Sequence, residues 1–474
     1  MGLGDIADGL ARQAERAGAD VGALFFEPVI RLGVTGLARA GKTVFITALV
    51  ANLLDRGRMP QFAAAASGAI RAAWLEPQPD DTVPRFEYET HLDALTGPAP
   101  RWPRSTRQVS QLRLSLKVQP GGLLSGLSGP RTVHLDIVDY PGEWLLDLAL
   151  LERDYAGWSR DVLERARARG AMAAGFLGLV DAADPDAPYD EAPAQALAAR
   201  YTAYLQAARE AGLSDCTPGR FLLPGEMEGS PVLTFAPLPP GAGNGPRGSL
   251  RREMARRFEA YKAQVVKPFF RAHFARIDRQ VVLVDALGAI HAGPVAVEEM
   301  RRAMAGILAA FRPGRTSWLA GLLGRRRVDR ILFAATKADH LHHSEHAKLT
   351  AIVEAALAEA KRRADFAGAE TAAMSIAALR ATVEDTVTHE GRTLDCVRGR
   401  RLDTGAEAAF HAGTLPADPA AILAPARAGA AAWPGAGYGA VAFAPAPLTL
   451  RPGEGPPHIR LDRAAEFLLG DKLT

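Results

Sequence analysis

The segment GLARAGKT, residues 36–43, has the G-x-x-x-x-G-K-[ST] spacing of a loop that binds nucleotide phosphates. Gly36 and Gly41 would let the backbone curl so that amide hydrogens point at phosphate oxygens. Lys42 would supply positive charge to the β- and γ-phosphates, and Thr43 would offer a hydroxyl to Mg²⁺. A helix that opens at Lys42 would direct its positive dipole end at the same anion. The motif therefore predicts nucleotide binding in preference to a simple glycine turn, and the expected binding set also includes Arg39, Ala40 and Val44.

A second motif, Asp139-Tyr140-Pro141-Gly142, reads D-x-x-G at the end of an apolar run. An aspartate at this place would hold Mg²⁺ through a water molecule, and the Gly142 amide would sense the γ-phosphate. Because D-x-x-G is short, its weight comes from its position after a strand and downstream of the phosphate loop. Asp285 also ends an apolar run, but the residues after it lack the spacing, so Asp139 is favoured for the metal.

The third motif, Thr336-Lys337-Ala338-Asp339, follows the apolar run ILFAA and fits [NT]-K-x-D. The Asp339 carboxylate can accept hydrogen bonds from N1–H and N2–H₂ of guanine, a pairing that adenine cannot offer. The Lys337 stem can lie along the face of the base. A surface Lys–Asp turn is the ordinary alternative, and the preceding buried strand favours guanine recognition over it.

Apolar runs and helical periodicities indicate the elements that position these motifs. Strands are expected at 29–36, 111–118, 132–139, 279–285 and 330–336, and helices at 44–54, 347–361 and 461–473. Strands thus alternate with helices, which predicts an α/β fold with a parallel-rich sheet of the P-loop NTPase, GTPase-like, type. Residues 151–275 are largely helical in pattern, so this core would carry a large helical insertion.

The predicted organisation follows from these patterns. Residues 1–27 are expected to form an N-terminal helical extension. Residues 28–145 and 276–400 would form the GTPase core, and residues 146–275 the helical insertion domain. Residues 401–474, rich in Ala, Pro and Gly, would be irregular apart from the terminal helix.

Composition excludes several classes of protein. Lys and Arg number 56 against 53 Asp and Glu, a net charge of +3, which does not argue for nucleic-acid binding. Two cysteines exclude a disulfide scaffold and suit a reducing compartment. The first ten residues show no signal peptide, and the long uncharged run at 428–450 is interrupted by prolines and glycines, so we do not expect it to span a membrane.

The three motifs in this order resemble the translation-factor class of P-loop GTPases. More narrowly, the chain is similar over nearly its whole length to the bacterial YcjX-like family of stress-associated GTP-binding proteins. The stretches that carry this similarity are GLARAGKT (36–43), WPRSTRQVSQLRL (102–114), DYPGEWL (139–145), IDRQVVLVDAL (277–287), LFAATKADHLH (332–342), SIAALRAT (375–382) and IRLDRAAEFLLGDKL (459–473). The second and last of these are specific to that family.

The resemblance implies further roles. Thr106 would complete the Mg²⁺ shell as the threonine of the first switch loop, with Trp102, Ser105 and Arg107 around the nucleotide. The backbone amides of Ser375, Ile376 and Ala377 would contact the guanine oxygen, and His340 would border the base. It also implies a stress-response role beside a membrane-associated protein partner.

Departures from the common GTPase pattern concern catalysis. Thr336 replaces the more usual asparagine, which weakens a bridge to the phosphate loop but leaves the role of Asp339 intact. Glu143 stands where many GTPases have a glutamine that orients water, so the expected catalytic set is Lys42, Gly142 and Glu143, with slow intrinsic hydrolysis. Arg39 would either contact the nucleotide or point to solvent, and the sequence does not decide between these.

The sequence therefore predicts a cytoplasmic, Mg²⁺-dependent protein that binds GTP and GDP and hydrolyses GTP as a switch. Two alternatives stay open, an ATPase that carries T-K-x-D and a nucleotide-binding scaffold with negligible hydrolysis. Homodimerisation and peripheral attachment at the inner face of the membrane are also left open. The histidines at 340, 342, 343 and 346 have no carboxylate or cysteine at ligand spacing, so a solvated loop is favoured over a zinc site. WLAGLLGRRR (318–327) is interpreted as a helix end with exposed arginines.

Overall fold

A computed structural model describes residues 27–36, 40–103, 108–120, 129–241, 243, 245–273, 276–310, 328–358, 362, 369–428, 433 and 438–473. The helix expected in residues 1–27 lies almost entirely outside this range, as do the stretch 318–327 and the predicted site residues Arg39, Ser105, Thr106 and Arg107.

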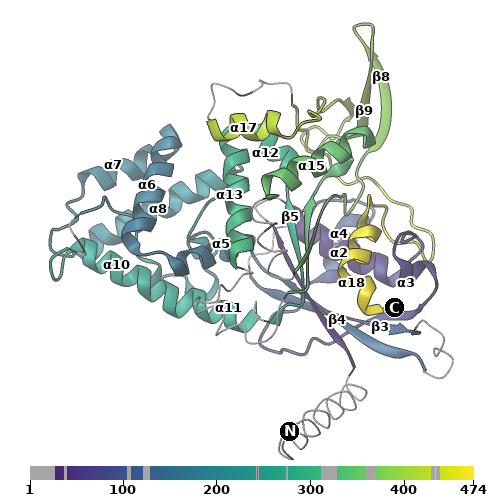
Figure 1. Ribbon diagram of the computed structural model, residues 1–474, viewed down its shortest axis with the longest axis horizontal. Helices are drawn as coiled ribbons and strands as arrows, with labels where there is room; N and C mark the ends of the chain where they lie inside the picture. The colour runs from purple at the N-terminus through teal and green to yellow at the C-terminus, as the bar shows by residue number, and fades with distance from the viewer. Residues whose placement is uncertain are drawn as a thin grey trace, which may run out of the picture.

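The centre of the fold is a seven-stranded sheet in the order β2-β3-β4-β1-β5-β6-β7 (Figure 1). Five neighbouring strands are parallel: β4 (Arg131–Asp139), β1 (Val29–Gly36), β5 (Arg279–Val284), β6 (Arg330–Ala335) and β7 (Glu370–Ser375). β3 (Ser110–Val118) and β2 (Ile70–Glu76) continue the sheet antiparallel. This confirms the predicted α/β fold with a parallel-rich sheet, and the predicted strands agree with the observed ones within one residue at each end.

Side chains of the central strands alternate between two apolar layers. Val281 and Leu283 pack with α2 (Lys42–Leu54) and α18 (Leu461–Leu473) on one face. Val282 and Val284 pack on the other face, in the core that includes α12 (Ala286–Ala292), α13 (Pro294–Ala310) and α15 (His346–Ala356). Burial on both faces explains why these strands are continuously apolar in sequence. Each large apolar side chain removed from water in this way contributes about 1.5–3 kcal/mol.

The segment between β4 and β5 forms the predicted helical insertion, which projects to one side of the sheet (Figure 1). The segment begins with α5 (Gly142–Leu146) and a short 3₁₀ helix, η1 (Asp147–Glu152). The helical lobe that follows contains α6 (Tyr155–Ala168), α7 (Ala174–Ala182), α8 (Glu191–Glu210), α9 (Gly219–Leu222), α10 (Leu250–Tyr261) and α11 (Lys267–His273).

Aromatic side chains fill the centre of this helical lobe. Trp158 stacks on Phe258 at a centroid distance of 4.9 Å, and Phe235 and Tyr201 meet the Trp158 ring edge-on. Arg169 at the end of α6 donates from Nε and Nη2 to Glu299 of α13, at 2.9 and 2.8 Å. The aromatic centre of the lobe is thus continuous with the apolar core on one face of the sheet, and a buried charge pair fastens the lobe to α13.

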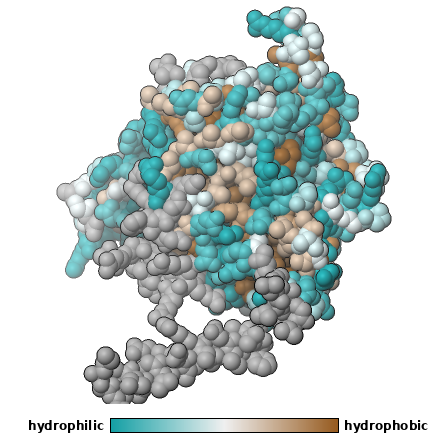
Figure 2. Space-filling view, turned by 45° about the vertical axis from the view of Figure 1, so that its right-hand side comes forward, coloured by the Kyte–Doolittle hydropathy of each residue, from teal (hydrophilic) through white to brown (hydrophobic). Residues whose placement is uncertain are grey.

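A second, three-stranded antiparallel sheet was not predicted. It consists of β8 (Val383–His389), β9 (Arg392–Arg400) and β10 (Glu407–Phe410), and its β8–β9 hairpin stands away from the body of the molecule (Figures 1 and 2). β10 and α17 (Ala420–Ala428) lie in the region that we expected to be irregular, so that expectation was wrong for these residues. β2, α3 (Ala63–Ala66) and α4 (Tyr88–Thr96) were also missed.

The terminal helix α18 was predicted correctly, and it closes one face of the sheet. Arg279, which is fully buried at the start of β5, donates to the Leu468 carbonyl at 3.0 Å and to Asp471 at 2.8 Å. Arg460, just before the helix, donates to the Ser375 carbonyl at 3.0 Å. None of the described helices is long and apolar enough to cross a bilayer.

Candidate functional site

The described residues of the expected phosphate loop, Gly36 and residues 40–43, lie at the end of β1 and the start of α2. Gly41 precedes the helix with a φ of 80°, a left-handed conformation that side chains disfavour, so glycine suits this position. A Cβ atom on Gly36 would lie 2.9 Å from Cβ of Leu283, which excludes larger residues there. Ala40 is buried and Val44 lies half-buried in the first turn of α2. The helix therefore starts directly beside the loop, with its amide end toward the expected phosphates.

Lys42, Thr43 and Asp139 come together although they lie about a hundred residues apart. β1 and β4 are parallel neighbours with Val34 opposite Asp139, so both strands end at the same edge of the sheet. Lys42 Nζ is 4.0 Å from Asp139 Oδ1, and the Asp139 side chain is 1% exposed. Thr43 is buried in the first turn of α2. A cation and a carboxylate thus meet beside the first turn of α2, which also carries Thr43, where the motifs predicted a phosphate–metal site.

Gly142 begins α5, and Glu143 follows it in the first turn. The Glu143 carboxylate is buried, and Arg209 of α8 donates from Nε at 3.0 Å to its Oε1. This partner was not expected from the sequence, because it lies on a helix of the insertion. The positive charge of Arg209 compensates the negative charge of Glu143, and the ion pair connects the first residues after the D-x-x-G motif to the lobe.

α5 and η1 make two further contacts with the lobe. The guanidinium of Arg220 lies 3.3 Å over the Trp144 ring, a cation–π contact. Asp147 accepts hydrogen bonds from the Gly219 amide at 2.8 Å and from the Tyr261 hydroxyl. Burial raises the pKa of Asp147 to about 7, against the opposing effect of these hydrogen bonds and of Arg220.

The T-K-x-D motif lies at the ends of β6 and β5, on the same edge of the sheet. Lys337 adopts a left-handed conformation with φ 60°, and its ammonium donates to Asp285. Asp285 also caps α12 by accepting from the Gly288 amide at 3.0 Å. Asp285, the rival candidate for the metal, is therefore engaged with Lys337 of the T-K-x-D motif.

Asp339 is 4% exposed, and its Oδ2 accepts the Ala381 amide at 2.8 Å. The Thr382 hydroxyl donates to the Asp339 carbonyl. The loop after β7 therefore orients the carboxylate, while Oδ1 makes no such bond among the residues described.

Ser375, Ile376 and Ala377 lie beside this motif, and the Ile376 carbonyl accepts the Ala338 amide at 3.0 Å. Their own amides, however, donate within the fold, to the Thr350 hydroxyl and to the carbonyls of Ala335 and Ile459. Their predicted contact with guanine would compete with these bonds.

Trp102 and His340 meet through a residue that the sequence analysis did not identify. Trp102 Nε1 donates to the Phe443 carbonyl at 2.7 Å, and the His340 ring lies edge-on to Phe443 at 5.2 Å. Burial lowers the pKa of His340, which favours the neutral ring. Two residues expected around the nucleotide, from distant parts of the chain, are thus brought together. No local pattern marks Phe443, because it belongs to a segment without regular periodicity.

Comparisons with known proteins show the family of the chain. The profile of the YcjX-like family, DUF463, matches residues 30–473. A protein of Escherichia coli K12 named Ras-like GTPase YcjX is 38% identical over 459 residues, which cover 94% of this chain and 96% of the relative. A protein of Shewanella oneidensis with the same name is 35% identical over 469 residues, covering 94% of each chain.

Proposed function

Because this chain belongs to the YcjX-like family, we propose that it binds GTP and GDP at the edge of the sheet where β1, β4, β6 and β7 end, and that it hydrolyses GTP. The observation that carries the proposal is the convergence of Lys42, Asp139 and Asp339 on one edge, since parallel strands place ligands at their carboxyl ends. The names of the two relatives supply the activity; the motifs supply its location.

The residues divide into phosphate, metal and base functions. Lys42 and the amides at the start of α2 would hold the phosphates. The Thr43 hydroxyl and the Asp139 carboxylate offer the hard oxygen atoms that Mg²⁺ prefers and would hold it, with Thr106 as a further expected ligand. When bound, Mg²⁺ neutralises charge that develops on the β- and γ-phosphates.

For the base, Asp339 would accept from guanine while the Ala381 amide fixes its orientation. Because the amides of Ser375, Ile376 and Ala377 are engaged, we propose that those of Ala378 and Leu379 contact the guanine oxygen. Neither of these two amides donates to an acceptor in the part of the chain that the structure describes.

The rate of hydrolysis would depend on whether the ion pair between Glu143 and Arg209 is intact. A buried carboxylate that is already paired with an arginine is a weak hydrogen-bond acceptor for an attacking water molecule, which supports slow intrinsic turnover. The same pair favours the second candidate function, a nucleotide-binding protein with negligible hydrolysis. Single-turnover measurement with radiolabelled GTP separates the two.

Guanine recognition is tested by exchanging Asp339. Asp339→Asn keeps an oxygen for the Ala381 amide but replaces the acceptor for guanine N2–H₂ by a donor that suits xanthine. We expect GTP affinity to fall about 100-fold or more and xanthosine triphosphate to bind better than GTP. Asp385→Asn, at a half-buried position of β8 where the carboxylate pairs with Arg398, serves as the control and should bind GTP like the wild type. If ATP competes with GTP equally in the wild type, the guanine assignment is wrong.

Phosphate binding is tested by Lys42→Ala, measured by calorimetry with GTP. Lys42 contributes its charge to the ligand and not to the apolar core, so the variant should fold and lose tight binding. Lys348→Ala removes a lysine that pairs with Glu345 on the surface of α15 and should leave binding unchanged. Unchanged binding in Lys42→Ala would contradict the site.

A further inference from the structure

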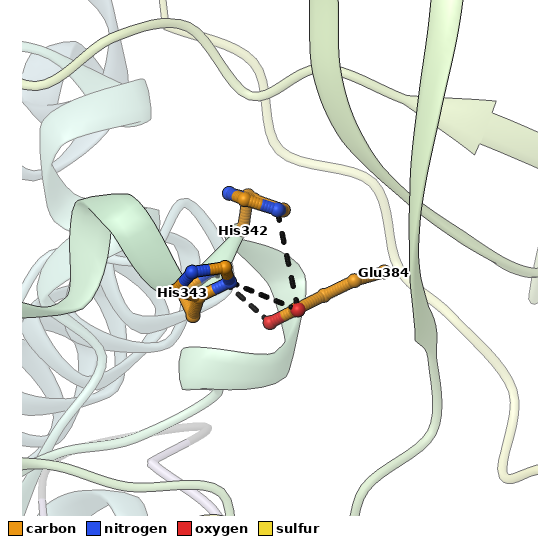
Figure 3. A group of neighbouring side chains, drawn as sticks. All are labelled: His342, His343 and Glu384. Atoms are coloured by element: carbon orange, nitrogen blue, oxygen red, sulfur yellow. Dashed lines mark hydrogen bonds and ion pairs between the residues drawn. The ribbon is translucent and has the colours of Figure 1, made fainter.

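A group of metal-ligating side chains lies outside the nucleotide site, at the foot of the β8–β9 hairpin (Figure 3). It consists of His342 and His343, which follow the base-recognition motif, and Glu384 of β8. The sequence favoured a solvated loop because no carboxylate or cysteine stands at ligand spacing from these histidines in the chain. The fold supplies one from 41 residues away.

The geometry suits a shared metal ion. His343 Nδ1 is 2.9 Å from Glu384 Oε2, and His342 Nε2 is 4.0 Å from the same oxygen. In a tetrahedral zinc site with bonds of about 2.0–2.1 Å, neighbouring ligand atoms lie about 3.3 Å apart. Small side-chain rotations that move the ligand atoms by less than about 1 Å would convert the observed separations into those of a zinc site.

A second carboxylate supports His342 from behind. His342 Nδ1 is 2.9 Å from the Ser344 hydroxyl and 3.6 Å from Asp395 Oδ2. Asp395 shares a face of the hairpin with Glu384, because β9 pairs Val397 with Glu384 and Asp395 with Thr386. Nδ1 also lies 3.5 Å from the Ser344 amide, a longer contact than the one with the hydroxyl. In the tautomer with the proton on Nδ1, the ring donates toward the Ser344 hydroxyl and Asp395 and leaves the Nε2 lone pair toward Glu384, which is the usual support of a metal-binding histidine.

Access is also suitable. The side chains of His343, Glu384 and His342 are 66%, 33% and 15% exposed, so an ion can enter from solvent. Three protein ligands leave a fourth position for water. Imidazole together with carboxylate is a donor set for zinc and similar transition metals, whereas Mg²⁺ prefers oxygen ligands alone.

We propose that His342, His343 and Glu384 bind one divalent transition-metal ion of the zinc type, and that the ion fastens the small sheet to the loop that carries Asp339. Hydrogen bonds already join the segment before β8 to the loop of Asp339, since the Ala381 amide and the Thr382 hydroxyl both donate to Asp339. A metal ion bound by Glu384 and the two histidines would add a third connection between the same two segments. By fastening the loop of Asp339, the ion would also strengthen guanine-nucleotide binding; this effect rests on the proposed function, whereas metal binding itself does not.

Metal binding is tested on the full-length protein, free of a histidine tag and of nucleotide, after treatment with a chelator. Titration with Zn²⁺ should show one equivalent with a Kd of about 1 μM or tighter, and Co²⁺ should give the visible absorption of a tetrahedral site. Glu384→Gln and His342→Ala should each weaken binding about tenfold or more, and Asp395→Asn by about tenfold.

Asp385→Asn is the matched control. Asp385 is the next residue of β8, lies on the opposite face and pairs with Arg398. It should bind Zn²⁺ like the wild type. Stoichiometric binding that is equal in wild type, Glu384→Gln and His342→Ala, or no binding at all, would overturn the proposal.

Coupling is tested by titrating GDP in the presence of Mg²⁺, with Zn²⁺ or with a chelator selective for zinc. Removing Zn²⁺ should lower GDP affinity about fivefold in the wild type and in Asp385→Asn, and should change nothing in Glu384→Gln. Zn²⁺ binding without any effect on GDP would refute the fastening role. If no guanine nucleotide binds, the proposed function fails while the zinc titration still decides the metal site.

Discussion

Asp147 allows a quantitative prediction about the contact between α5 and the helical lobe. Its carboxyl group is 2% exposed, and burial raises its pKa from 3.8 to about 7. An unfolded chain would return the pKa to its ordinary value. Between these two values the folded state therefore binds more protons than the unfolded state, and stability falls as the pH rises.

The size of the effect follows from the shift. One pKa unit corresponds to about 1.4 kcal/mol, so a rise from 3.8 to about 7 gives about 4 kcal/mol in total. This contribution is fully present below about pH 4 and is lost as the pH rises through 7. Between pH 5 and pH 7 the loss amounts to about 2 kcal/mol.

Asp147→Asn isolates this contribution. The amide oxygen can accept from Gly219, and the amide NH₂ can donate to the Tyr261 oxygen, so the hydrogen bonds are kept without an ionisable group. The difference in the free energy of unfolding, wild type minus variant, should fall by about 2 kcal/mol from pH 5 to pH 7. Urea unfolding followed by tryptophan fluorescence measures it, since Trp144 and Trp158 lie in the same core.

A matched control is Asp161→Asn, which removes an exposed carboxylate that pairs with Arg153. Its pH dependence should follow that of the wild type. If wild type and Asp147→Asn show parallel curves between pH 5 and pH 7, Asp147 does not titrate there and the reasoning from burial is wrong.

Two further predictions concern other charge pairs. Glu143→Gln should change the single-turnover rate of GTP hydrolysis about tenfold or more, with GTP affinity nearly intact. In a double-mutant cycle, Arg209→Gln should alter the effect of the Glu143→Gln substitution on that rate. Additive effects of the two substitutions would mean that the ion pair does not influence catalysis. Arg279→Met should lower the free energy of unfolding by about 3 kcal/mol, because the buried anchor of α18 is lost, whereas Arg401→Met, an exposed control, should leave it unchanged; equal stability of both variants would refute this role of Arg279.

The central sheet could be predicted because its strands are apolar on both faces. Arg279–Val284 and Arg330–Ala335 are buried along nearly their whole length, so each is a continuous apolar run in the sequence. β8 could not be predicted in this way. Val383–His389 is exposed or half-buried throughout and is mostly polar, so it has no alternation to reveal it. β2 is an edge strand that is half-buried over most of its length.

In the candidate site, too, some features could be predicted from the sequence and others could not. The loops around Lys42 and Asp339 are encoded by short local motifs, in which each residue type has a chemical reason. The partners of those residues are tertiary contacts. Arg209 reaches Glu143 from a different helix, and Phe443 joins Trp102 to His340 from the C-terminal region. Nothing in the sequence around Arg209 or Phe443 distinguishes them from other arginines and phenylalanines.

The contact between α5 and α9 indicates how a change at the nucleotide would reach the lobe. A Cβ atom on Gly219 would lie 2.3 Å from the Glu143 carbonyl oxygen, so the two backbones touch with no side chain between them. Backbone segments packed this closely cannot approach each other further, so they either move together or separate. If the γ-phosphate draws the Gly142 amide toward it, α9 must follow or the contacts at Glu143 and Asp147 must break. Both outcomes alter the lobe, so we expect its surface to differ between the GTP and GDP states.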